Sequence, residues 1–221
     1  MLRLLFCCLG LLAGSSLRGA DTSALTRWLS SQTNMQTWTA DVTQTRSLKT
    51  LVQPLVARGH VWFAAPNQFR WEIGSPAETI AVRQPEEMLV IYPRLKRAEK
   101  YPLGAQAAGP WKDTLALLEA GFPRSSEELE SKFKVVSEKE TDHTHEVSLQ
   151  PKAASARRMM PLIKISFSLD DFSLRATELQ FADGSSMKNE FTNQKLNPSL
   201  GADVFKPVIA NDFKIVEPLK R

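Results

Sequence analysis

The chain has 221 residues, with 28 Lys and Arg against 24 Asp and Glu. Two of the basic residues, Arg3 and Arg18, lie in a leader that we expect to be removed, which leaves 26 against 24 and a net charge of +2. A nucleic-acid-binding protein needs a denser positive surface than this. We therefore expect no nucleic acid among its partners.

Residues 1–20 have the order of a secretory signal peptide. Arg3 precedes an apolar run over residues 4–12, and small residues follow up to Ala20. The run is shorter than the roughly 18 to 20 apolar residues that cross a bilayer as a helix. We expect a cut between residues 15 and 20, and a single periplasmic domain over residues 21–221.

Both cysteines, Cys7 and Cys8, lie inside the predicted leader. The mature chain would therefore have no disulfide and no cysteine metal ligand. The two cysteines also lie too early, within the apolar run, to become a lipidated N-terminus. We expect a soluble, untethered product whose length suits one sizeable core.

The first predicted element is a short amphipathic helix with Leu25, Trp28 and Leu29 at helical spacing, ending near Ser31. From Trp38 the apolar period changes to two, which is typical of strands with one buried face. Further strands are predicted, with proline or turn residues between them, over residues 56–63, 68–73, 79–83, 88–92 and 97–101.

Two helices are predicted in the middle of the chain. The first has an apolar stripe at intervals of four, three and four, formed by Trp111, Leu115, Leu118 and Phe122. The second starts at Ser125, which has capping-box spacing to Glu128, and runs to about Phe133.

Strands resume after these helices. Apolar residues alternate over residues 145–149, 163–169 and 172–181, and a basic link without regular structure is expected over residues 151–161. Asp183-Gly184 predicts a hairpin with a two-residue type I′ turn, and a last short strand is expected near residues 213–216. The fold is therefore expected to be mainly β with α (α+β), with one large antiparallel sheet that closes, pairs or curls around its helices.

The motifs of catalysis are not found in the sequence. The chain has no Gly-x-Ser-x-Gly elbow, no phosphate-binding glycine loop and only three histidines. His143 and His145 could share one strand face, but no acidic or sulfur cluster of matching spacing accompanies them. We expect no catalytic residue, no metal, no cofactor and no enzymatic activity.

Two features have more than one interpretation. Aromatic and aliphatic residues are dense over residues 62–73, which fits either an apolar ligand cavity under a helix or ordinary core packing. Basic residues gather within residues 94–100 and at Arg157 and Arg158, which fits either solvated surface or docking to an anionic membrane or partner.

Residues 59–76, GHVWFAAPNQFRWEIGSP, resemble the core motif of the LolA family of periplasmic outer-membrane lipoprotein carriers. The motif is a glycine, an aromatic strand, a proline, then Phe-Arg-Trp and a second proline. The resemblance covers most of the mature chain in the right order, and continues through residues 78–82, 88–93, 179–186, Phe191, Asn197-Pro198 and Phe205-Lys206-Pro207.

The resemblance implies a strongly curved, incomplete antiparallel half β-barrel of the LolA/LolB type, with a lid of two to three α-helices over a hydrophobic cavity. It implies a monomeric carrier that takes lipoprotein acyl chains from an inner-membrane ABC transporter of the LolCDE type to an outer-membrane acceptor of the LolB type. The alternative is a LolA-like carrier for another amphiphile, a glycolipid or pigment-like lipid, associated with an envelope export system. The candidate lipid-binding residues are Trp62, Phe69, Trp71, Ile73, Ile80, Val82, Val90, Tyr92, Leu115, Leu118 and Phe122.

One position departs from the family pattern. The well-known enterobacterial type has an arginine directly before the first proline, where it ties the lid to the barrel, and here that residue is Ala65. Strand alternation directs the nearby Arg70 away from Phe69 and Trp71, so this role is not carried over. Two other classes are alternatives: a periplasmic enzyme acting on lipids, which the lack of a nucleophile, base or metal constellation disfavours, and a structural envelope protein with a merely packed core.

Overall fold

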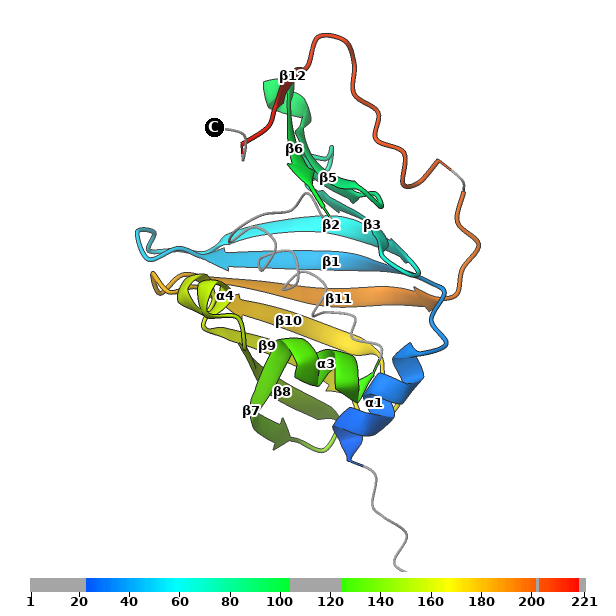
Figure 1. The fold of residues 1–221 in the computed structure, drawn as a ribbon, viewed down its shortest axis with the longest axis vertical. Helices are drawn as coiled ribbons and strands as arrows, with labels where there is room; N and C mark the ends of the chain where they lie inside the picture. The colour runs from blue at the N-terminus through cyan, green and yellow to red at the C-terminus, as the bar shows by residue number, and fades with distance from the viewer. Residues whose placement is uncertain (1–22, 104–124, 202, 219–221) are drawn as a thin grey trace, which may run out of the picture.

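The computed structural model describes residues 23–103, 125–201 and 203–218. These residues form one twelve-stranded sheet and a few short helices (Figure 1). The strands are β1 (Thr37–Ser47), β2 (Leu55–Ala64), β3 (Gln68–Ile73), β4 (Thr79–Arg83), β5 (Glu87–Tyr92), β6 (Arg97–Pro102), β7 (Phe133–Glu140), β8 (Thr144–Pro151), β9 (Leu162–Ser168), β10 (Leu174–Gln180), β11 (Ser186–Leu196) and β12 (Lys214–Val216). The helices are α1 (Ala24–Gln32), α3 (Ser126–Lys132), α4 (Ala154–Met159) and the single 3₁₀ turn η1 (Pro93–Leu95).

The sheet is open, and its order is β12-β6-β5-β4-β3-β2-β1-β11-β10-β9-β8-β7. All neighbouring strands are antiparallel except β12, which pairs with β6 in parallel. Figure 1 shows β5 and β6 running steeply across the direction of β1 and β11, so the sheet is strongly twisted from one end to the other. The predicted fold class, a mainly β domain with an unclosed antiparallel sheet, is confirmed.

Helix α1 begins and packs as its sequence predicts. The side chain of Ser23 accepts a hydrogen bond from the Thr26 backbone N–H at 3.2 Å, which satisfies one of the free donors of the first turn. The apolar side of α1 buries Trp28 and Leu29 in the main core, which also contains residues of α3, α4 and strands β1, β2 and β7 to β11. The helices therefore cover one face of the half of the sheet that ends in β7.

Glycine at position 59 is required by the close approach of β2 and β3. A Cβ atom at Gly59 would lie 1.8 Å from the backbone carbonyl oxygen of Glu72, far inside van der Waals contact. The motif glycine thus allows the backbones of β2 and β3 to lie close together at this position.

Two other motif residues anchor the C-terminal segment. The Asn197 side-chain oxygen accepts hydrogen bonds from the backbone N–H groups of Gln36 and Thr37 at 2.8 and 3.2 Å, so the end of β11 is fixed to the start of β1. Further along, Phe205 is buried, and its carbonyl accepts a hydrogen bond from the Gln84 amide at 3.3 Å. The segment then crosses the sheet and ends in β12 (Figure 1).

Three sequence-based expectations are corrected. Helix α4 occupies part of the link 151–161, because Ala156 and Met160 are buried in the core and hold this short helix without a side-chain N-cap. Strand β7 was not predicted, since it is an edge strand on which charged residues are exposed. The hairpin at Asp183-Gly184 forms, but among these two residues only Gly184 has a positive φ, so its turn is not type I′.

Other expectations agree with the structure or lie outside it. Helix α3 begins after Ser125, whose hydroxyl accepts a hydrogen bond from the Glu128 N–H at 3.1 Å, as predicted. The last strand also lies where it was expected. The leader and the helix predicted over residues 111–122 lie outside the described residues.

Candidate functional site

A cavity of about 820 Å³ lies on the face of the sheet that carries the helices. Strands from both halves of the sheet, β1 to β5 and β9 to β11, border this one space, so the sheet curls around it and this face is concave. Its apolar lining is formed by Leu55, Val56, Ala57, Val61, Phe63, Phe69, Trp71, Ile73, Ala81, Met88, Ile163, Ile165, Leu174, Leu179, Met187 and Phe191.

Strand register explains why these residues share one face. Trp71 lies opposite Val61 on β2 and opposite Ala81 on β4. Two residues earlier on β3, Phe69 lies opposite Phe63 on β2 and opposite Arg83 on β4. Since side chains alternate between the two faces of a strand, the residues at these positions all point into the cavity.

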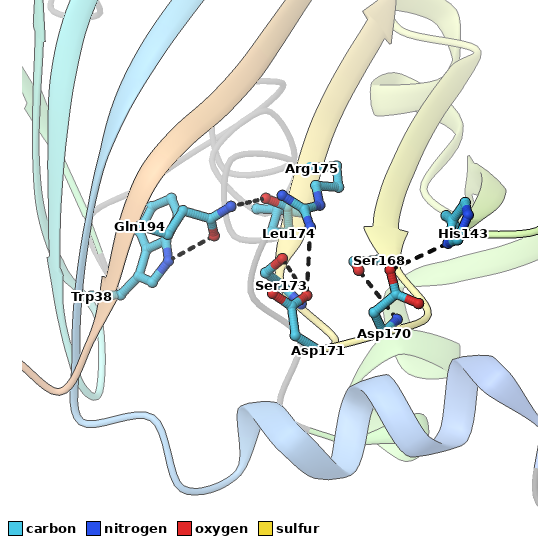
Figure 2. A network of polar contacts seen from close by, with 9 residues as sticks. All are labelled: Trp38, His143, Ser168, Asp170, Asp171, Ser173, Leu174, Arg175 and Gln194. Carbon is cyan, nitrogen blue, oxygen red and sulfur yellow. Dashed lines mark hydrogen bonds and ion pairs between the residues drawn. The ribbon is translucent and has the colours of Figure 1, made fainter.

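Aromatic rings form one wall of the cavity. Phe191 on β11 lies edge-on to Trp38 at 5.4 Å and to Trp71 at 5.9 Å, measured between ring centroids. The Trp38 indole N–H donates to the Gln194 side-chain oxygen at 3.2 Å, and the Gln194 amide donates to the Leu174 carbonyl at 2.7 Å (Figure 2). These hydrogen bonds hold the wall rigidly across β1, β11 and β10.

The polar network of Figure 2 continues beyond the cavity, in the turn between β9 and β10. The Asp171 carboxylate accepts hydrogen bonds from the Ser173 hydroxyl at 2.6 Å and from its N–H at 3.0 Å. The Ser173 side chain and backbone together hold the pKa of Asp171 below its ordinary value. On the same turn Asp170 contacts His143 at 3.4 Å, and both side chains are largely exposed.

A few polar groups interrupt the apolar lining. Arg83 is the most buried of the charged ones, with 7% of its surface exposed, and it lies between Phe69 and Met88 in the strand register. Tyr92 adds a phenol whose pKa is raised by burial, so the group stays a protonated hydrogen-bond donor. The cavity therefore combines a large apolar surface with two arginines, Arg46 and Arg83, two carboxylates, Glu78 and Glu128, and a few neutral polar groups.

Five of the candidate residues border the cavity: Trp62, Phe69, Trp71, Ile73 and Tyr92. The ring of Trp62 packs on His60 at 4.3 Å, on the opposite strand face from Val61 and Phe63, so its contribution is peripheral. Val90 lies on the cavity face of β5 and packs against the small cluster of Met88 and Leu103.

Ile80 and Val82 do not line the cavity. They lie on the other face of β4, and Ile80 packs there with Leu89, Ile91 and the C-terminal residues Ile209 and Phe213. Both faces of β4 are covered, one by the cavity and one by the C-terminal segment, so hydrophobicity alone does not tell which face borders the cavity. Leu115, Leu118 and Phe122 lie outside the described residues, and lipid binding by any of these positions stays a prediction.

Several lining residues were not singled out from the sequence. Ile163, Ile165 and Leu179 were recognised only as alternating strand residues, because nothing local shows that β9 and β10 face β3 across a cavity. Arg83 could have been found from strand alternation, which places it on the same face as Ala81.

The described residues include no cluster of three His, Cys, Asp or Glu side chains that could hold a metal ion. His145 is buried between two carboxylates, with its ring nitrogens 2.8 Å from Glu138 and 3.1 Å from Glu140. Arg70 contacts Glu72 at 2.5 Å and donates to the Val204 carbonyl at 3.3 Å, on the face away from the cavity as predicted. Within the same described residues, no helix has the length and hydrophobicity needed to span a membrane.

An open half-barrel that curls around a large, mostly apolar cavity is the architecture of a protein that holds an apolar ligand. Residues 33–208 match the family described as outer membrane lipoprotein carrier protein LolA. This match covers most of the chain, and the protein belongs to the LolA family. No curated protein matches the chain in sequence.

The chain is similar to several solved structures at low sequence identity. An uncharacterised conserved protein from Thermus thermophilus is 10% identical with a TM-score of 0.52, covering 88% of this chain and 99% of the other. A LolA superfamily protein from Nitrosomonas europaea is 8% identical with a TM-score of 0.42, covering 82% and 97%. Lipoprotein LppX from Mycobacterium tuberculosis is 11% identical with a TM-score of 0.40, covering 81% and 97%.

Proposed function

We propose that this protein is a periplasmic carrier that holds the acyl chains of lipoproteins in its concave cavity and moves them from the inner to the outer membrane. The observation that carries the proposal is the cavity of about 820 Å³, lined by aromatic and aliphatic side chains from both halves of the sheet. This volume is within the range of pockets that bury a whole ligand. Membership of the LolA family supports the same class of cargo.

The transfer requires no covalent step. Moving an acyl chain out of water gains about 0.8 kcal/mol per CH₂ group. A carrier that retained this whole gain would never release its cargo, so loading and release follow differences in affinity between donor, carrier and acceptor. The family suggests an ABC transporter of the LolCDE type as donor and a LolB-type acceptor.

A second cargo is favoured by one specific residue. Arg83 places a buried guanidinium on the cavity face, beside Phe69 and Met88. A lipid that carries a carboxylate or phosphate next to its chains would pair with this cation, whereas acyl chains alone would not. A carrier for an anionic amphiphile, such as an acidic glycolipid or pigment-like lipid, is therefore the alternative.

The test is to purify the protein from the envelope of its own host and to identify the co-purifying ligand by native mass spectrometry. An acylated lipoprotein would support the first proposal, and an anionic lipid would support the second. A protein that is recovered empty and does not bind a fluorescent fatty acid would contradict both. Recovery of cleaved lipid products would indicate an enzyme instead.

A further inference from the structure

The hairpin that joins β1 to β2 exposes a cluster of apolar side chains. Val52 is fully exposed at its tip, and Leu51, Leu55 and Val56 are 45%, 49% and 63% exposed. Exposed apolar residues that occur singly are ordinary, but a contiguous group of them marks a surface that binds something apolar.

This exposed cluster is continuous with the cavity. Leu55 and Val56 also border the cavity, together with Arg46 on the paired strand position of β1. The apolar lining therefore reaches the surface at the base of the hairpin. A ligand leaving the cavity at this end would pass along the exposed side chains.

Two other segments lie beside the hairpin. The register of β1 with β11 places Ser47 opposite Ser186, next to the turn at 181–185. The Ala182 N–H in that turn donates to the Met159 carbonyl of α4 at 3.0 Å. Figure 1 shows α4 and both hairpin tips at the same side of the molecule. We name residues 46–58, 152–159 and 181–185 together the hairpin edge.

The hairpin edge is strongly basic, although the chain without its predicted leader has a net charge of only +2. It contains a single acidic residue, Asp183, and six basic ones: Arg46, Lys49, Arg58, Lys152, Arg157 and Arg158. Among the described residues none of the six forms an ion pair with a carboxylate, and Arg157 instead donates to the carbonyls of Pro151 and Lys152. Within the described part of the chain their charges are therefore not neutralised by ion pairs, so they are available to an anionic partner.

We propose that the hairpin edge docks on the surface of an anionic lipid bilayer, with the tip at Leu51 and Val52 inserted among the headgroups. Apolar side chains flanked by cations are what such a surface selects, since insertion and attraction to anionic headgroups add together. Docking in this way would turn the end of the cavity that reaches the surface at the base of the hairpin towards the acyl chains of the membrane. The inference rests on the proposed function only for this last step, the uptake of an acyl chain.

The experiment measures sedimentation of the purified protein with vesicles of phosphatidylcholine alone or mixed with phosphatidylglycerol. We expect binding to the mixed vesicles that falls as salt is added. The double variant Leu51→Ser with Val52→Ser, and separately Lys49→Glu with Arg58→Glu, should each lower the partition coefficient about tenfold or more. Neither pair is in the core, so circular dichroism should be unchanged.

Matched controls change the same chemistry elsewhere. Val208→Ser with Ile215→Ser removes two apolar residues that are also exposed, and Lys206→Glu with Lys214→Glu makes the same change in net charge, both on the C-terminal segment. These controls should stay within about twofold of the parent protein.

Three outcomes would overturn the inference: the parent protein fails to sediment with anionic vesicles, the hairpin variants bind as well as the controls, or the hairpin variants change only the oligomeric state. Binding of a fluorescent fatty acid without vesicles is measured in parallel. If that binding is absent while vesicle docking persists, the proposed cargo is wrong and the docking surface stands.

Discussion

The indole ring of Trp28 on α1 lies flat against the phenyl ring of Phe167 on β9, with centroids 5.0 Å apart and planes 8° from parallel. His145 on β8 stacks on the same phenyl ring at 5.1 Å. Trp28 is 1% exposed and Phe167 is fully buried. These rings join the N-terminal helix to the far half of the sheet.

Replacing Trp28 by alanine should lower the free energy of unfolding by about 3 to 5 kcal/mol, because it removes a buried aromatic side chain and leaves a cavity. Urea denaturation followed by circular dichroism measures this loss. The control is Val208→Ala, at an exposed position that should change stability by less than about 0.5 kcal/mol. A loss of less than about 1 kcal/mol for Trp28→Ala would show that α1 is not held by this stack.

Filling the cavity should block cargo without harming the core. Ala81 points into the cavity between Trp71 and Val90, so tryptophan at this position would occupy ligand space. We expect Ala81→Trp to weaken fluorescent fatty acid binding about tenfold or more, since several CH₂ groups lose their burial. Its unfolding free energy should stay close to that of the parent.

The control for this change is Ala64→Trp, at a position on the other face of β2 that is not part of the cavity. It should bind the probe as the parent does. Equal binding by both variants would mean that the probe occupies another site.

Arg83 should distinguish acidic from neutral ligands. We expect the parent to bind a fatty acid about tenfold more tightly than its methyl ester, and Arg83→Met to remove this difference, because a hydrogen bond to a charged group contributes about 1.5 to 3 kcal/mol. Competition against a fluorescent fatty acid gives both affinities.

The ratio of the two affinities does not depend on how much of the Arg83 variant is folded. Arg175→Met, at an exposed arginine beside Asp171, serves as the control. If the parent binds acid and ester equally, Arg83 has no role in ligand choice and the anionic cargo is disfavoured.

Asp171 should contribute to stability only where it is ionised. Its folded-state pKa is lowered by the hydrogen bonds from Ser173, so its stabilisation is present above the ordinary aspartate value and is lost as pH falls through the lower folded value. Because 61% of this side chain is exposed, we expect Asp171→Asn to cost no more than about 1 kcal/mol at neutral pH. At acid pH, as the pH falls through that lower folded value, the cost should shrink.

Urea denaturation at the two pH values measures the Asp171 effect. Asp170→Asn is the control, since that carboxylate makes only the longer 3.4 Å contact to His143. A cost for Asp171→Asn that is the same at both pH values would point to a steric effect instead of an electrostatic one.

Much of the fold could be predicted from local patterns. Alternation over residues 68–73 identified β3 at the bounds the structure gives, and the Ser125 cap located α3. Strand β7 and helix α4 could not be found in this way, because β7 is an exposed edge and α4 depends on burial of Ala156 by distant residues.

The cavity was harder to predict than the fold. Phe69, Trp71 and Ile73 were placed on one face by alternation, which is a local property. The choice between the two faces of β4 depended on the C-terminal segment, more than a hundred residues away, and only the structure shows Phe213 packing near Ile80. The exposed hairpin of β1 and β2 was likewise hidden, since nothing in its sequence shows which apolar residues lack a neighbour.

The place of β1 in the sheet has a consequence for how the chain acquires its structure. Strands β1 to β6 are successive neighbours and could pair as they are made, but β1 also pairs with β11, joining Val42 to Phe191. Contacts so distant in sequence form late, because the intervening chain must first be closed into a loop. A chain that emerges from its N-terminus onward therefore reaches its central strand pair only when nearly all of it is present. Chains that end before β11 would leave Trp38 and Trp71 without the ring that lies between them.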